Sequence, residues 1–71
     1  MIKINENIYI FSEQIVVIEL EEIINPSLGE RSYKWVFYTT STARPVVNSR
    51  IFETKEEALN WFESIKKELG G

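Results

Sequence analysis

The chain changes its hydrophobic period once, near Thr54, and this change restricts the folds open to it. Before Thr54, apolar side chains alternate with polar ones or form short β-branched runs, a pattern typical of strands. After it, apolar residues recur every three or four positions, as on one side of a helix. Thr54 and Glu57 have the spacing of a capping box, and Gly70 and Gly71 are suited to end the helix. The sequence therefore predicts strands followed by one helix over residues 54–71.

Four β-type segments precede the helix, and their connections are short. We expect strands at residues 8–11, 15–24, 32–40 and 46–52, while residues 2–4 form either a further strand turn or a frayed end. Pro26 and Gly29 mark a loop, and Pro45 closes a second turn. Consecutive strands with short links pair antiparallel. The prediction is one α+β domain over residues 1–71, a four-stranded antiparallel β-meander with one C-terminal α-helix packed on one face.

The composition disfavours catalysis and metal binding. The chain has no His or Cys, and all 11 of its acidic residues are Glu. Transition metals therefore lack their usual ligands, and acid–base chemistry near neutral pH would need a Glu, Lys or Tyr with a shifted pKa. Glu19, Glu21 and Glu22 lie along one strand, where a solvated face is the simpler interpretation than a cation site. We expect a non-catalytic protein with no cofactor and no metal site.

The apolar segments are too short to indicate a membrane-spanning helix or a signal peptide. The longest unbroken apolar run covers residues 15–18, whereas a membrane-spanning helix needs about 20 residues. The first residues do not combine a basic start with a long apolar stretch, as a signal peptide would. We expect a cytoplasmic protein that makes no membrane contact.

Alternation along the strands predicts that one face of the sheet packs in the core and that the other is left for a partner. If the 15–24 and 32–40 segments pair as a hairpin, one face carries the core residues Ile18, Leu20, Tyr33, Trp35 and Phe37. Val47 and Ile51 are predicted to join them from the next strand. The opposite face then carries four residues that are candidates for partner binding: Ile15, Val17, Val36 and Tyr38. One helix covers only one face of a sheet, so we expect a second copy of the chain, as in a homodimer, or another protein to cover this one.

The charge distribution leaves an alternative function open. Residues 1–30 contain six Glu and one Lys, residues 31–52 contain four bases and no acid, and the whole chain has a net charge of -3. A basic, aromatic sheet segment can bind single-stranded nucleic acid, and the residues for it here would be Lys34, Tyr38, Arg44 and Arg50. Cross-strand pairing of Lys34 and Arg50 with Glu19 and Glu21 is the simpler interpretation, because an acidic protein binds nucleic acid weakly. A third hypothesis is an accessory inhibitor of phage type, which blocks a host protein with its Glu-rich segments.

The order of elements also carries a resemblance. The run Ile8-Tyr9-Ile10-Phe11-Ser12-Glu13-Gln14-Ile15-Val16, the charged hairpin after it and the helix opening Phe52-Glu53-Thr54-Lys55-Glu56-Glu57-Ala58-Leu59 resemble small bacterial and phage proteins of unassigned function. The β-β-β-β-α order is also similar to that of the PC4/Whirly-type single-strand binders. That resemblance implies a sheet that binds nucleic acid, although sheets of that kind are usually strongly basic. No motif of these proteins matches, so no residue role follows from the resemblance.

Overall fold

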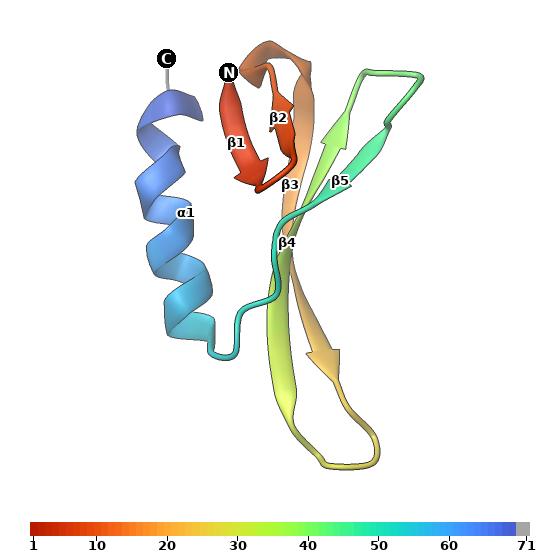
Figure 1. Ribbon diagram of the computed structural model, residues 1–71, viewed down its shortest axis with the longest axis vertical. Helices are drawn as coiled ribbons and strands as arrows, with labels where there is room; N and C mark the ends of the chain where they lie inside the picture. Colours follow the sequence, from red (N-terminus) through yellow and green to blue (C-terminus); the bar gives the residue numbers. More distant parts are fainter. Residues whose placement is uncertain (70–71) are drawn as a thin grey trace.

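The computed structural model describes residues 1–69, and it contains five strands, one short 3-10 helix and one α-helix (Figure 1). In chain order these are β1 Ile2–Asn5, β2 Ile8–Ile10, η1 Ser12–Gln14, β3 Ile15–Ile24, β4 Arg31–Thr39, β5 Val46–Asn48 and α1 Lys55–Leu69. The α+β class, the antiparallel pairing and the C-terminal helix are confirmed. The predicted helix end at Gly70 and Gly71 lies outside the described residues.

The strands form two sheets, which differs from the predicted single meander. β1 pairs with β2 in a two-stranded sheet, and β3, β4 and β5 form a three-stranded sheet with β4 in the centre. The segment predicted as the first strand of the meander is β2, and it pairs with residues 2–5 instead. The turn of η1, closed by a 3.0 Å hydrogen bond from the Gln14 N–H to the Phe11 carbonyl, separates β2 from β3. This redirection of the chain lets the first hairpin leave the larger sheet.

The long hairpin of β3 and β4 follows from its loop. The Asn25 N–H donates to the Glu30 carbonyl at 2.8 Å, and the Gly29 N–H donates to the Asn25 carbonyl at 2.8 Å. Gly29 has a φ of 67°, a left-handed conformation that glycine adopts without a Cβ penalty. The loop sets the register in which Leu20 lies opposite Trp35, and both are on the face that alternation assigns to the core.

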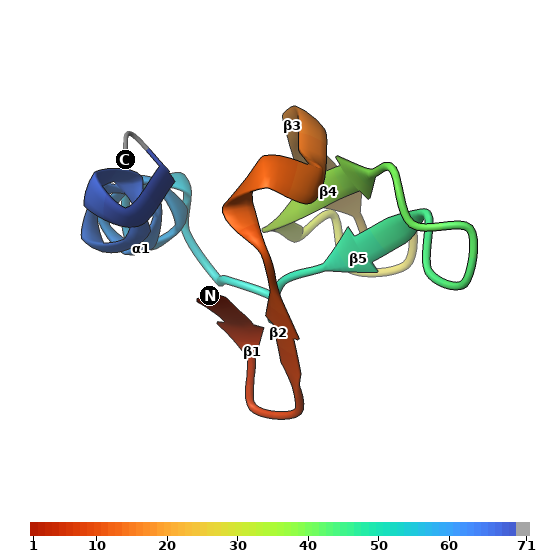
Figure 2. The same cartoon turned by 90° about the horizontal axis from the view of Figure 1, so that it is seen from above.

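The core lies between α1, the β1–β2 hairpin and one face of the three-stranded sheet. Viewed from above, α1 and the hairpin lie on the same side of that sheet (Figure 2). Phe37 and Phe52 are completely buried, and the Trp61 ring of α1 lies 6.2 and 5.6 Å from their ring centroids. The first hairpin contributes buried Ile2 and Ile4, a role that the sequence did not indicate for residues 2–4. The helix α1 and the β1–β2 hairpin therefore cover one face of the three-stranded sheet together.

The end of β5 departs from simple alternation. Val47 is in the core as predicted, but Ile51 is exposed and Phe52 takes the buried position. The Tyr33 and Phe52 backbones exchange two hydrogen bonds, of 2.8 and 2.7 Å. If the register of the Phe37–Val47 pair continued, Tyr33 would lie opposite Ile51, so the segment after β5 contains one extra residue. The extra residue turns Ile51 outward.

Ser49 holds this irregular segment against β4. Its Oγ accepts a 2.8 Å hydrogen bond from the Trp35 N–H and donates one of 2.8 Å to the Arg50 carbonyl, at a buried position. Ser49→Ala should therefore lower the free energy of unfolding by about 1–3 kcal/mol, because a buried N–H loses its partner. Urea unfolding measures this change. Ser64→Ala on the exposed side of α1 is the control, with an expected change within about 0.5 kcal/mol. Equal changes in the two variants would contradict the assigned role of Ser49.

Candidate interaction surface

The face of the β3–β4–β5 sheet opposite α1, here called the outer face, is built from cross-strand rows. The first row is Val17, Tyr38 and Val46, and the second is Glu19, Val36 and Asn48. A third row pairs Glu21 with Lys34. Residues that lie directly opposite each other on neighbouring strands point to the same side of a sheet, so each row crosses the outer face. The face is therefore apolar at the end near Val17 and charged toward Glu21.

The apolar row is accessible. Val17 is 50% exposed, Val46 is 44% exposed, and Tyr38 is half-buried between them. Figure 2 shows α1 and the first hairpin on the other side of the sheet, so neither covers the row. Three adjacent side chains from three strands form a small patch of apolar surface, which is suited to contact with another protein.

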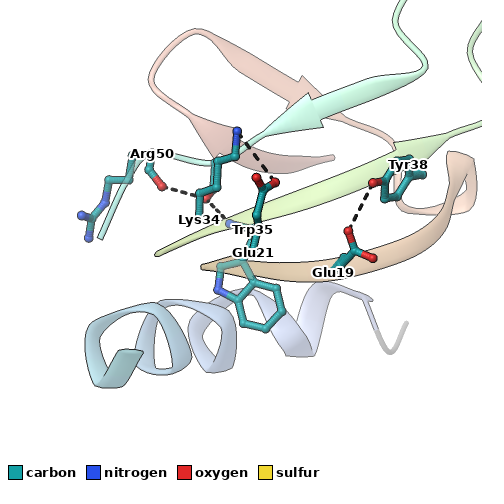
Figure 3. A network of polar contacts seen from close by, with 7 residues as sticks. Glu19, Glu21, Lys34, Trp35, Tyr38 and Arg50 are labelled. Carbon is teal, nitrogen blue, oxygen red and sulfur yellow. Dashed lines mark hydrogen bonds and ion pairs between the residues drawn. The ribbon is translucent and has the colours of Figure 1, made fainter. Parts of the chain in front are cut away.

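Tyr38 joins the apolar row to the charged part of the face. Its hydroxyl donates a 3.3 Å hydrogen bond to the Glu19 carboxylate (Figure 3). The negative charge of Glu19 is the main cause that raises the pKa of Tyr38. The phenol therefore stays protonated at neutral pH and acts as a donor on this face.

Of the four predicted partner-binding residues, one lies on the other face of the sheet and one is on the expected face but buried. A β-bulge between Ile15 and Val17 shifts the register, so Ile15 packs against the core instead of lying on the outer face. Val36 does lie on the outer face, but it is only 4% exposed, in the row of Glu19 and Asn48. Val17 and Tyr38 remain accessible, as the alternation predicts. Val46 completes the row, and its parity relative to buried Val47 was the signal that could have identified it.

The four basic or aromatic residues of the nucleic-acid hypothesis do not form a continuous track. Lys34 lies 4.0 Å from the Glu21 carboxylate, and Figure 3 shows this pair at a distance from Tyr38 along the sheet. Arg44 lies in the exposed loop between β4 and β5, where its carbonyl accepts a 2.7 Å hydrogen bond from Thr39 Oγ1. The Arg50 guanidinium lies 4.1 Å from the ring centroid of buried Phe52. Lys34 and Tyr38 thus lie on the outer face, and each has a carboxylate beside it, that of Glu21 and of Glu19 respectively.

Metal-binding clusters and membrane-spanning helices are absent from the described residues. Among residues 1–69, no three His, Cys, Asp or Glu side chains gather in a way that could hold a metal ion. Neither helical segment in these residues has the length and apolar character that crossing a membrane requires. Comparison of the chain with protein families, with curated proteins and with solved structures finds no match.

Proposed function

We propose that this protein is a non-catalytic interaction module that self-associates through the outer face of its three-stranded sheet. The observation that carries the proposal is the accessible row of Val17, Tyr38 and Val46. Apolar surface of this kind gains free energy when another surface removes it from water, at about 25 cal/mol per Å2. A second copy is the partner that is present whenever the protein is.

One symmetric arrangement of two copies packs the apolar row of each copy against that of the other. A two-fold axis that runs parallel to β4, between two facing sheets, sets β3 of one copy over β5 of the other. Val17 then faces Val46, and Glu19 faces the neutral Asn48. An axis perpendicular to the strands that crosses the apolar row instead sets β3 over β3 and Val17 over its own copy. The first arrangement buries the apolar row and keeps the Glu side chains of β3 apart from their copies, while Lys34, which lies 4.0 Å from the Glu21 carboxylate, faces its own copy.

The double substitution Val17→Lys and Val46→Lys tests this proposal. It introduces repelling charges at both ends of the row, so it should turn a self-associated species into a monomer of 8.3 kDa. Light scattering over a wide range of protein concentration measures the molar mass. Ile24→Lys with Leu28→Lys is the matched control, because both residues are exposed apolar side chains outside the row.

The proposal also predicts how the molar mass of the unmodified chain depends on concentration. Its molar mass should rise above 8.3 kDa with concentration, and the control variant should behave in the same way. A mass of 8.3 kDa for the unmodified chain at every concentration would reject self-association through any surface. Equal loss of association in both variants would reject the outer face as the contact.

The nucleic-acid alternative receives less support from the geometry. Single-stranded binders combine stacking aromatic rings with a positive groove along the backbone. Here Trp35 and Phe37 point into the core, and Lys34 shares the outer face with Glu19 and Glu21. These carboxylates weaken attraction to phosphates on the face where a strand of nucleic acid would lie.

A further inference from the structure

β3 has a free long edge. Within residues 1–69 its sheet partner is β4, and no strand pairs with its other side. Figure 1 shows β3 running almost the full length of the molecule. An unpaired strand edge offers a row of backbone donors and acceptors to another extended chain.

The hydrogen-bond pattern shows which residues of β3 offer these groups. The Tyr33 N–H and C=O both bond to Phe52, so Tyr33 directs its backbone groups toward the β5 side of β4. Its neighbour Lys34 therefore directs its groups toward β3, where Glu21 is its partner. Alternation along β3 then points the N–H and C=O of Ile18, Leu20 and Glu22 away from the sheet. These three residues form the binding groups of the free edge.

One side of this edge adjoins an apolar strip of α1. Lys55 and Leu69 each line a surface hollow that also contains β3 residues, of about 390 and 370 Å3 respectively. The helical repeat places Leu59, Phe62 and the exposed Lys66 between these two ends on the same side of the helix. Leu59 is exposed, and Phe62 and Leu69 are half-buried. A strand added to β3 would therefore lay alternate side chains against Leu59 and Phe62 in the middle of this side, between Lys55 and Lys66.

The other side of the edge is acidic. Glu19 and Glu21 lie on the outer face at alternate positions of β3, and both are exposed. Side chains directly opposite each other across an antiparallel pair have Cβ atoms about 4.5–5.5 Å apart, close enough for charges to interact. A neighbouring strand with Lys or Arg at alternate positions would complement both carboxylates.

We propose that the free edge of β3 binds an extended segment of another protein in which basic and apolar residues alternate. The basic residues face Glu19 and Glu21, and the apolar residues lie between β3 and α1, against Leu59 and Phe62. The backbone of the segment pairs with the outward groups of β3. This binding site is separate from the apolar row of the outer face and does not depend on self-association.

Charge repulsion argues against a second copy of the chain at this edge. A two-fold axis placed anywhere from Glu19 to Glu22 sets at least one pair of Glu side chains directly opposite each other, which is destabilising. An axis at Ile18 avoids this contact, but the bulge at Val16 interrupts the pairing within two residues of the axis. The charges from Glu19 to Glu22 thus disfavour pairing of this part of the edge with its own copy and favour a basic strand.

A fluorescent peptide in which Lys and Val alternate is the probe for this proposal. Fluorescence anisotropy with the full chain should show saturable binding, and a peptide with the same composition arranged as a Lys block and a Val block should bind at least about tenfold more weakly. Amide hydrogen exchange locates the contact. The Ile18, Leu20 and Glu22 amides should exchange quickly in the free protein and become protected on binding.

Charge reversal supplies the matched variants. Glu19→Lys with Glu21→Lys should weaken binding of the alternating peptide at least about tenfold, because two attractions become repulsions. Glu6→Lys with Glu30→Lys changes the net charge equally at exposed positions away from the edge and should bind nearly as the unmodified chain does. Equal weakening in both variants would reduce the effect to net charge and overturn the proposal. Failure of the peptide to bind, or protection of the three amides before it is added, would also overturn it.

Discussion

Deletion of residues 54–71 should leave a chain that no longer unfolds cooperatively. The deletion removes buried Ala58 and Ile65 and uncovers Phe37 and Phe52, which α1 keeps from water. Fully burying one large apolar side chain contributes about 1.5–3 kcal/mol, and a domain of this size is stable by only about 5–10 kcal/mol in total. Several such losses exceed the total stability. Circular dichroism during heating measures the transition.

The control for this deletion keeps the helix and removes only exposed charges. Glu63→Ala with Lys66→Ala abolishes an ion pair of 3.7 Å between two exposed side chains of α1. Pairs of this type contribute about 0.3–0.5 kcal/mol, so this variant should melt close to the unmodified chain. A cooperative melting transition in the truncated chain would show that α1 is dispensable.

Trp35→Ala should lower the free energy of unfolding by about 3–5 kcal/mol, the largest effect we expect from one substitution. The indole is buried, stacks on Phe62 with ring centroids 4.4 Å apart, and donates a 2.8 Å hydrogen bond to the Ala58 carbonyl. Figure 3 shows it extending from β4 toward α1. Removing it opens a cavity where the sheet contacts the helix. Urea unfolding measures the loss.

A second variant separates the two contributions of Trp35. Trp35→Phe retains an aromatic ring beside Phe62 but removes the indole N–H bond to the Ala58 carbonyl, which lies within α1, and part of the buried ring; together these losses should cost about 1–3 kcal/mol. Phe11→Ala removes an aromatic side chain that is already half exposed and should cost less than either. If Phe11→Ala destabilised the protein as much as Trp35→Ala does, the indole would not have the central role assigned to it.

The elements that could be predicted are those with strong local patterns. The change of period at Thr54 located the helix, and the Thr54 Oγ1 does accept a hydrogen bond of 3.1 Å from the Glu57 N–H. The alternation in residues 32–40 placed Trp35 and Phe37 in the core correctly, because hairpin pairing preserves parity. The candidate site was predicted in part, since Val17 and Tyr38 lie on the outer face as expected.

The errors in assigning side chains to the two faces of the sheet came from single residues that break the alternation along a strand. The bulge at Val16 moved Ile15 to the core, and the extra residue before Phe52 turned Ile51 outward. A shift of one residue exchanges the two faces of a strand, and nothing in the local composition marks where such a shift occurs. Burial of Val36 depends on its cross-strand neighbours, which alternation alone does not describe.

Local patterns in the sequence are sufficient to predict the α+β class, the C-terminal helix, the β3–β4 hairpin and the face of most strand side chains. These features depend on contacts between residues close in the chain, or on one loop that sets the register. The division of the strands into two sheets, the packing of the β1–β2 hairpin against the core and the free edge of β3 beside α1 follow only from the complete fold. Those outcomes depend on which distant segments bury the most apolar surface together, and that competition involves the whole chain at once.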